Sequence, residues 1–455
     1  MKDNTLENLL NVLGFFPFVF LIFCGIFLSF KGKFFQLRFL PRSAKLMKKA
    51  FKESRKTEGI TSFKAACTSL SAAVGTGNIA GVAAAISVGG AGAVFWMWVS
   101  AVLGMAIKAC EINLGIHYRQ KETGEFLGGP MFYIKKGLPV FLKPLAFVFA
   151  LAGIPAVFCT GNITQTNAAV ESITDNIKLR LIFGLVFALF TYISVWGGMN
   201  RIANVTEKIV PIMSLIYIII CSIVIILNID FLPEAFKMII VGAFKPKAVT
   251  SGAVGSVFAT ALIGARRGIF SNEAGIGTAA IAHSAAQDAN PQNQGLFGIF
   301  EVFVDTLLIC TLTALTIICS QVPINYGKIT SAELAVDAIS QVFGKTSNIL
   351  ISLMLCLFAF SSIIGWAAYG EIFSYFLKGD ILKKIFRLIY PLFCIFGAVA
   401  NVDLVWKLSD FFSGIMLVIN LPAIIMLSDE ALKFFIKEEK LYVEKKNRKN
   451  TGNIG

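Results

Sequence analysis

The chain has 455 residues, of which 56% are hydrophobic, 12% aromatic and only 15% charged. It is therefore far more apolar than an average soluble domain, which predicts a protein of the lipid bilayer. The net charge of +14 does not indicate a nucleic-acid partner, because the positive charge lies between apolar segments rather than on one face of a soluble domain. Nine cysteines stand singly in apolar runs without CxxC spacing, which argues against a disulfide framework or a zinc site. The two histidines, His117 and His283, are expected to be structural.

Eleven apolar segments are long enough to cross a bilayer. They cover residues 8–30, 61–90, 92–118, 143–168, 179–197, 208–228, 251–282, 296–321, 347–376, 383–401 and 404–428. Arg266 and Arg267 interrupt the seventh segment. The first segment has neither a basic leader nor a cleavage site, so we expect it to remain in the mature protein.

The distribution of Lys and Arg predicts the orientation of these segments. With the N-terminus outside, the cytoplasmic segments hold 31 of these residues and the external segments hold 9. The positive-inside rule then predicts a multi-pass protein of the cell membrane with its C-terminus in the cytoplasm. The basic, partly amphipathic stretch 31–64 is expected to lie on the inner surface against anionic head groups. The charged tail from Glu438 is expected to be disordered.

The order of the segments predicts two halves of opposite orientation. Removing the first segment leaves ten, and each group of five begins with a span that glycines interrupt. Because five is odd, two successive groups must be inverted relative to each other, as in inverted-repeat transporters. The predicted regions are 1–30 (extra span), 31–60 (basic connector), 61–228 (first repeat), 229–250 (external connector), 251–428 (second repeat) and 429–455 (cytoplasmic tail).

Ser71 to Gly81, SAAVGTGNIAG, is the most informative stretch. Each of Gly75, Gly77 and Gly81 weakens a helix by roughly 1 kcal/mol relative to Ala. Non-helical backbone at membrane depth is tolerated only where it is buried in protein or lines a cavity, and the ends of half-helices can bind ions. Close helix packing is the alternative interpretation of the glycines. A nucleotide-binding glycine motif is rejected, because the last glycine is one residue too far and no strand precedes it.

Among the charged residues inside predicted spans, two pairs are close in sequence. Lys108 and Glu111 are three residues apart and are expected to form a structural pair on one helix face. Glu301 and Asp305 are four apart, which brings two like charges together unless a cation lies nearby. Asp305 is a functional candidate, and its alternative is a salt bridge to Arg266 or Arg267. In the second half the interrupted span is ATALIGARRGIFSNEAGIG, with Gly264, Gly268, Gly275 and Gly277.

Polar side chains also interrupt two other spans. Ser361 and Ser362 lie midway along one span, with Trp366 one turn further on. Adjacent hydroxyls usually bond back to their own helix, but opposite free carbonyls they offer the hard oxygen ligands that a small cation prefers. Trp366 is either a core aromatic residue or one wall of a cavity. Gln165 and Asn167 either join helices or reach a polar ligand.

Six motifs in the same order resemble the alanine/glycine:cation symporter family, the sodium-coupled amino acid carriers of bacteria and archaea. They are GTGNIAG, GGAGAVFWMWVSAVLGMA, GGPMFYIKKGL, QTN, RRGIFSNEAGIG and GWAAYGE, and the resemblance covers nearly the whole chain. It implies an all-α integral membrane protein with the inverted five-helix-repeat fold of the leucine transporter. Discontinuous helices belong to that fold, and one extra span brings the expected total to eleven.

The resemblance also implies roles for individual residues. Backbone N–H groups of Thr76, Gly77 and Asn78 would meet the substrate carboxylate, Gln165 would hydrogen-bond the ligand, and Trp366 would border a pocket for a methyl or hydrogen side chain. Na⁺ would be held by five oxygens, namely the carbonyls of Ser71, Val74 and Phe358 and the hydroxyls of Ser361 and Ser362. Asn78 is present for a second sodium site, whose other ligands the sequence does not identify.

The expected function is secondary active symport of small neutral amino acids, alanine or glycine, with Na⁺. The sequence leaves open the preference among alanine, glycine and D-enantiomers, and coupling to H⁺ in place of Na⁺. An ion channel is a weaker alternative, because a pore favours repeated rings of charge or carbonyls. An enzyme is not expected, since H-E-x-x-H and G-x-S-x-G motifs are absent. We expect a monomer without a nucleic-acid partner.

Overall fold

The protein is described from a computed structural model, which covers residues 3–122, 124–246, 250, 256–327, 332–344, 346–400 and 402–436. Helices dominate this part of the chain. The first half contains α1 (Asp3–Lys31), α2 (Phe35–Ser54), α3 (Ser62–Ala73), η1 (Thr76–Asn78), α4 (Ala80–Gly89), α5 (Gly92–His117), α6 (Pro130–Gly137), η2 (Val140–Leu142), α7 (Leu145–Phe158), η3 (Cys159–Ile163), α8 (Thr164–Glu171), α9 (Ile177–Trp196) and α10 (Gly198–Leu227).

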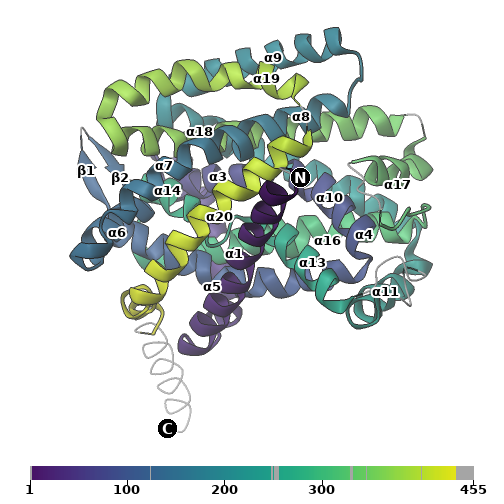
Figure 1. The fold of residues 1–455 in the computed structure, drawn as a ribbon, viewed down its shortest axis with the longest axis horizontal. Helices are drawn as coiled ribbons and strands as arrows, with labels where there is room; N and C mark the ends of the chain where they lie inside the picture. The colour runs from purple at the N-terminus through teal and green to yellow at the C-terminus, as the bar shows by residue number, and fades with distance from the viewer. Residues whose placement is uncertain are drawn as a thin grey trace.

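The second half repeats this helical character. Its elements are η4 (Ile229–Phe231), α11 (Leu232–Phe244), α13 (Val257–Asn272), α14 (Thr278–Ser284), α15 (Pro291–Val302), η5 (Phe303–Cys310), α16 (Thr311–Cys319), α17 (Glu333–Phe343), α18 (Thr346–Ile389), η6 (Tyr390–Leu392), α19 (Phe393–Val399) and α20 (Val402–Met426). One antiparallel hairpin, β1 (Gln120–Glu122) with β2 (Glu125–Leu127), lies beside α6 at one edge of the molecule (Figure 1).

The number of membrane spans differs from the expected eleven. Among the described residues, seven helices are long and apolar enough to cross a bilayer, or nine if each of two bent pairs is one span. Part of the difference lies in α18 and α19, which count as one apolar run although the backbone of α18 leaves helical geometry at Lys378 and Gly379. The rest lies at α13, which has only 16 residues. The count of eleven therefore stays a prediction.

The basic connector forms the amphipathic helix that its pattern indicates. The axis bends by 83° between α1 and α2, where Lys33 and Phe34 both have a φ of 54°. Phe35, Phe39 and Met47 are buried on one face of α2, whereas most of its basic side chains are exposed. Hydrophobic periodicity of this kind places one face on protein and the other in a polar environment.

Helix α5 is at the centre of the packing and touches α13, α14 and α15, while α3 packs on α10 and α18. Helices α9 and α19 lie side by side along the top edge of the view in Figure 1, and α1 runs next to α20. The predicted region boundaries are not tested by this arrangement. The tail beyond residue 436 and residues 251–255 of the seventh segment lie outside the described residues. The connector 229–250 contains the helix α11.

Candidate functional site

The first broken helix interrupts its hydrogen bonding at Val74 and Gly75. Helix α3 ends at Ala73, Val74 and Gly75 are extended, and the chain resumes in η1 and α4 after a 58° bend. Thr76 and Asn78 are buried in the protein. The glycines differ in what they permit: a Cβ on Gly75 would meet Ser362 and Gln165, whereas a Cβ on Gly81 would meet nothing within 4 Å. Close approach therefore requires a glycine at position 75 but not at position 81.

The Asn78 side chain holds this break open. In a continuous helix the Gly75 N–H would donate to the Ser71 carbonyl. Here it donates to Asn78 Oδ1 at 2.9 Å, and the Asn78 N–H donates to the Gly75 carbonyl at 3.1 Å. The carbonyls of Ser71 and Val74 are thereby released from helical pairing. Because buried polar groups need partners, these two carbonyls must be satisfied by groups from other elements.

Two serines of α18 face the released carbonyls. The Ser362 hydroxyl donates to the Ser71 carbonyl at 3.1 Å and lies 3.3 Å from the Val74 carbonyl. The Ser361 hydroxyl lies 2.9 Å from the Phe358 carbonyl and 3.4 Å from the Val74 carbonyl. The structure thus gathers all five residues of the predicted cation site. Their oxygens are neutral and buried, a donor set that suits a hard monovalent cation.

Gln165 contacts the part of the break that follows Gly75. Its Oε1 accepts hydrogen bonds from the Thr76 N–H at 3.1 Å and from the Thr76 hydroxyl at 2.9 Å. The amide oxygen therefore occupies the position at Thr76 where the family resemblance implies a carboxylate oxygen of the substrate. Gln165 follows the π-helical turn η3 and is buried. A π-helical turn often marks a functional position within a helix.

Trp366 and Asn167 have other neighbours. A Cβ on Gly161 of η3 would meet Trp366, whose ring lies 5.6 Å from that of Tyr369. Trp366 thus contacts Gly161, which lies one helix turn before Gln165. Its place beside a ligand stays a prediction. Asn167 donates to the carbonyls of Gly397 and Ala400 at 2.9 and 3.1 Å. Of the two interpretations for this amide, the structure supports the joining of helices.

The second broken helix opens later than its glycine pattern suggests. Helix α13 continues through Gly264 and Gly268 to Asn272, and only residues 273–277 are non-helical before α14. Glu273, Gly275 and Gly277 all have positive φ values there, of 56°, 86° and 91°. The two earlier glycines instead allow close packing, because a Cβ at either position would meet α5. The expectation that all four glycines mark the interruption is therefore wrong.

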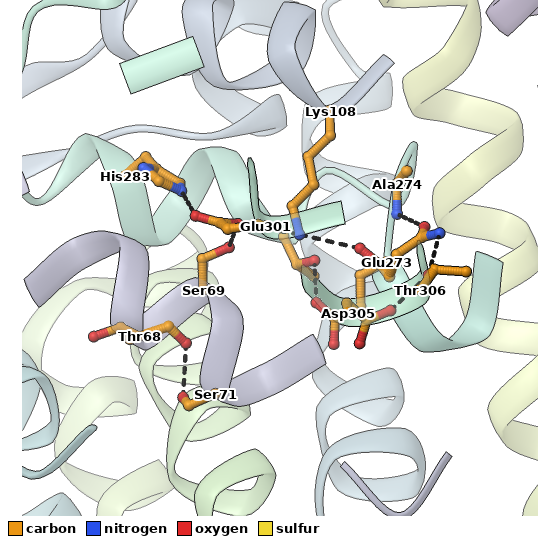
Figure 2. Close-up of polar contacts among 12 residues, drawn as sticks. Thr68, Ser69, Ser71, Lys108, Glu273, Ala274, His283, Glu301, Asp305 and Thr306 are labelled. Atoms are coloured by element: carbon orange, nitrogen blue, oxygen red, sulfur yellow. Dashed lines mark hydrogen bonds and ion pairs between the residues drawn. The ribbon is translucent and has the colours of Figure 1, made fainter. Parts of the chain in front are cut away.

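Lys108 binds the end of α13 rather than Glu111. Its ammonium donates to the Asn272 carbonyl at 3.0 Å and lies 3.2 Å from Glu301 Oε2. Figure 2 shows the Lys108 side chain beside Glu301. The predicted pair with Glu111 is wrong, because the last carbonyls of a helix carry partial negative charge and attract a cation. Glu111 instead accepts from Asn420 Nδ2 at 3.3 Å.

Glu301 connects Lys108 to both broken helices. It accepts from Ser69 of α3 at 2.7 Å, and its other oxygen lies 2.7 Å from Nε2 of His283 in α14 (Figure 2). All four side chains are buried. The like charges of Glu301 and Asp305 are thus tolerated with a cation beside Glu301. His283 holds a fixed place in this cluster, in agreement with a structural role.

Asp305 is the second acidic group between the breaks. Its carboxylate accepts from Asn78 at 2.7 Å, Ser271 at 2.8 Å and Thr306 at 2.7 Å. The alternative of a salt bridge to Arg266 or Arg267 is wrong, because Arg266 pairs with Asp410 and the Arg267 guanidinium lies over the Trp406 ring. Among the described residues Asp305 takes part in no ion pair within 4 Å. It joins Asn78 of the first break to the last turn of α13.

Sequence reasoning missed two residues of this region. Ser271 donates to Asp305, and Phe270 lies 3.3 Å from the place that a Cβ on Gly77 would occupy. Both directly precede the second break within RRGIFSNEAGIG. In an inverted repeat the residues before one break face the other break, and this symmetry is the signal that would have identified them.

Comparison with known proteins gives a consistent result. The sequence pattern of the sodium:alanine symporter family matches residues 3–453. The chain is 36% identical to the sodium/alanine symporter AgcS of Methanococcus maripaludis, over 94% of this chain and 95% of that protein. It is 37% identical to the probable sodium/glutamine symporter GlnT of Bacillus subtilis, over 93% of this chain and 88% of that one.

Solved structures support the same fold. The crystal structure of MhsT in complex with L-phenylalanine superimposes with a TM-score of 0.59 at 14% identity, covering 83% of this chain and 93% of that chain. The fold is therefore that of the leucine-transporter class, as the motifs implied. The family and its relatives are multi-pass membrane transporters rather than enzymes. On this evidence the chain belongs to the sodium:alanine symporter family.

Proposed function

We propose that this protein imports a small neutral amino acid, alanine or glycine, together with Na⁺ by alternating access. One observation carries the proposal: the carbonyls of Ser71 and Val74, freed from helical pairing, meet the hydroxyls of Ser361 and Ser362. The Phe358 carbonyl is the fifth oxygen, at 2.9 Å from the Ser361 hydroxyl. When Na⁺ binds, the hydroxyl hydrogens of Ser361 and Ser362 would turn away from the carbonyls. The two hydroxyl oxygens would then present their lone pairs to the ion.

The substrate would bind on the other side of the same break. Thr76 offers an N–H and a hydroxyl to a carboxylate, and the Gly77 N–H is a further donor. The Asn78 N–H now donates to the Gly75 carbonyl and would have to leave that bond to contact the ligand. Gln165 now occupies that position, so its amide would move to the ligand when the carboxylate replaces it. Phe270 beside Gly77 and Trp366 beside η3 restrict the space to a small side chain.

Coupling follows from the shared backbone. Val74 contributes to the ion site and Thr76 to the substrate site, two residues apart, so an ion that orders Val74 also orders the donors of Thr76. A ligand shifts a conformational equilibrium only through different affinities for the two states. Each Na⁺ entering through a potential of 100 mV supplies about 2.3 kcal/mol. That free energy supports accumulation of a zwitterion of zero net charge.

The proposal is tested by the variant Ser361→Ala/Ser362→Ala in proteoliposomes. We expect alanine counterflow at low Na⁺ to fall about 5- to 30-fold and the Na⁺ concentration for half-activation to rise, since about 1 to 2 kcal/mol is lost with two hydroxyl ligands. Ser374→Ala is the matched control, because Ser374 is a buried serine of the same helix whose hydroxyl has no partner. Unchanged Na⁺ activation in the double variant would exclude the ion site.

Proton coupling is the second candidate, and Asp305 is the observation that favours it. This buried carboxylate beside the first break contacts only neutral donors, so protonation would remove a charge that no cation balances. Counterflow measured across pH with Na⁺, Li⁺ or choline separates the two. Uptake that persists in choline and increases at low pH would favour H⁺.

We also propose that the N-terminus is outside and that the transporter works as a monomer. The excess of Lys and Arg on the predicted cytoplasmic side supports the orientation. Both broken helices and the serines of α18 come from one chain, which supports a site that is complete in one copy.

A further inference from the structure

Two adjoining cavities lie between the amphipathic helix α2 and the helices α3 and α10. The first has a volume of about 440 Å³ and apolar walls that include Met47, Phe63, Leu70, Val210 and Val304. The second has a volume of about 540 Å³ and is lined by Arg55, Lys64, Glu207 and Lys208. Phe51 and Pro211 belong to the walls of both. Together the two cavities form one groove, apolar at one end and polar at the other.

The polar end of this groove carries positive charge. Glu207 is balanced by Lys64 at 4.0 Å and accepts a hydrogen bond from Ser54 at 2.6 Å. Arg55 and Lys208 are exposed, and within the described part of the chain neither takes part in an ion pair. The Arg55 guanidinium lies over the Phe51 ring, 4.6 Å from its centroid. This contact places the guanidinium beside Phe51, which lines both cavities.

An unpartnered hydroxyl lies in the apolar end. Ser214 lines the first cavity, is 7% exposed, and its oxygen has no hydrogen-bond partner. Buried polar groups are normally hydrogen-bonded, and no described residue accepts from this hydroxyl, so it can donate to an acceptor that enters the cavity. Ser214 is six residues beyond Lys208 on α10, which places it about 9 Å further along the helix axis. One elongated ligand could therefore place an anionic group at Lys208 and a hydrogen-bond acceptor at Ser214, one to two helix turns further along α10.

We propose that this groove binds one anionic glycerophospholipid of the predicted cytoplasmic leaflet. The phosphate lies at Arg55 and Lys208, an ester carbonyl accepts from Ser214, and one acyl chain fills the apolar cavity. Two unpaired basic groups select a lipid with net negative charge over a zwitterionic one. A free phosphate or a soluble anion would leave the apolar walls and the Ser214 hydroxyl without a partner.

The bound lipid would brace the first broken helix. Phe63 and Leu70 belong to α3, which ends just before Val74, and Val304 belongs to η5, next to Asp305. The opposite wall comes from α2 through Met47. An occupied groove therefore ties the surface helix α2 to the elements that carry the candidate ion site. The binding itself does not depend on the identity of the transported substrate.

Native mass spectrometry of the full chain in neutral detergent tests the proposal. Palmitoyl-oleoyl phosphatidylglycerol and the phosphatidylcholine with the same chains are titrated separately. We expect one phosphatidylglycerol molecule to be retained more tightly than phosphatidylcholine, and the variant Arg55→Gln/Lys208→Gln to weaken its binding about 20-fold. The control Lys52→Gln/Lys56→Gln removes the same charge from exposed residues that line neither cavity, and it should weaken binding less than threefold.

Two further arms address the depth of the groove. Ser214→Ala removes only the hydroxyl and should weaken phosphatidylglycerol binding about 2- to 10-fold, as expected for the loss of one hydrogen bond. Glycerol 1-phosphate, which has the head group without chains, should not displace the lipid at equal concentration. Equal retention of the two lipids, equal losses in the groove and control variants, or displacement by glycerol 1-phosphate would each overturn the proposal.

Discussion

The two broken helices satisfy their free carbonyls in different ways. At the first break the carbonyls of Ser71 and Val74 meet only neutral hydroxyls. At the second break the Asn272 carbonyl, at the end of α13, receives the ammonium of Lys108. One half-helix therefore ends at the position where we propose that Na⁺ binds, whereas the other ends at a cation that the protein supplies itself. A half-helix end carries partial negative charge in both cases, so the comparison separates an exchangeable charge from a permanent one.

The second break is held by a buried ion pair that connects several helices. The Lys108 ammonium ties α5 to α13 and, through Glu301, to α3 and α14. Such a buried pair is costly to break, because removing one partner leaves an uncompensated charge. Among the described residues, no buried cation contacts the first break, and we infer that its geometry responds to the ion that we propose it binds.

Lys108→Met would remove the cation at the second break, and of the substitutions considered it should lower stability and transport the most. The substitution keeps most of the side-chain volume but leaves Glu301 buried without its ammonium, which costs about 3–5 kcal/mol. We expect a large fall in the thermal unfolding temperature in detergent and loss of transport, measured by fluorescence-detected unfolding and by alanine counterflow.

A double substitution serves as the control for this prediction. Lys108→Met/Glu301→Met removes both charges, and it should recover at least half of the lost stability, since apolar replacement of a whole buried pair is often nearly neutral. Lys143→Met removes an exposed lysine and should leave the unfolding temperature unchanged. A Lys108→Met protein as stable as the wild type would contradict the permanent-charge interpretation of the second break.

Gln165→Ala should have the next largest effect, and on the first break alone. It removes the amide oxygen that holds the Thr76 N–H and hydroxyl. In the proposed complex the same amide hydrogen-bonds the substrate, and the variant loses that bond. A hydrogen bond to a charged ligand is worth about 1.5–3 kcal/mol, so the KM for alanine should rise about 10- to 100-fold. Concentration series of alanine at saturating Na⁺ would measure this change.

Asn167→Ala is the matched control for Gln165→Ala. Asn167 lies two residues further along α8 and donates to Gly397 and Ala400 rather than to the break. It should lower stability and leave the KM for alanine within about threefold of the wild type, because it has no ligand to lose. Equal rises in KM for both variants would argue against a ligand contact at Gln165.

The sequence indicated the fold and the first break because their signals are local. Glycines in an apolar run, adjacent serines and alternating spans are visible residue by residue, and their family motifs placed Ser71, Ser361 and Gln165 together. The partners of charged residues were not predictable in this way. Lys108 and Glu111 are near neighbours on one helix, yet Lys108 binds Asn272 and Glu301 from other helices.

The glycines show the same limit. Spacing treats Gly264 and Gly275 alike, but the first permits the approach of α5 and the second adopts a positive φ. A packing glycine and a conformational glycine have the same local signature, and only the tertiary contacts distinguish them. The same holds for Asn167 and Gln165, two amides two residues apart with different roles.

Ser271→Ala should have the smallest effect and would test whether the two breaks communicate. Ser271 in the last turn of α13 donates to Asp305 at 2.8 Å, and Asp305 also accepts from Asn78 of the first break at 2.7 Å. Two of the three donors remain after the substitution, so we expect a loss of about 1 kcal/mol in stability. If Asp305 links the breaks, the Na⁺ concentration for half-activation should rise about two- to fivefold, although Ser271 has no predicted contact with the ion. Ser100→Ala is the matched control, because Ser100 is a buried serine whose hydroxyl donates to the Met97 carbonyl of its own helix. A loss of stability in Ser271→Ala without any change in Na⁺ activation would mean that the two breaks, although joined through Asp305, respond to the ion independently.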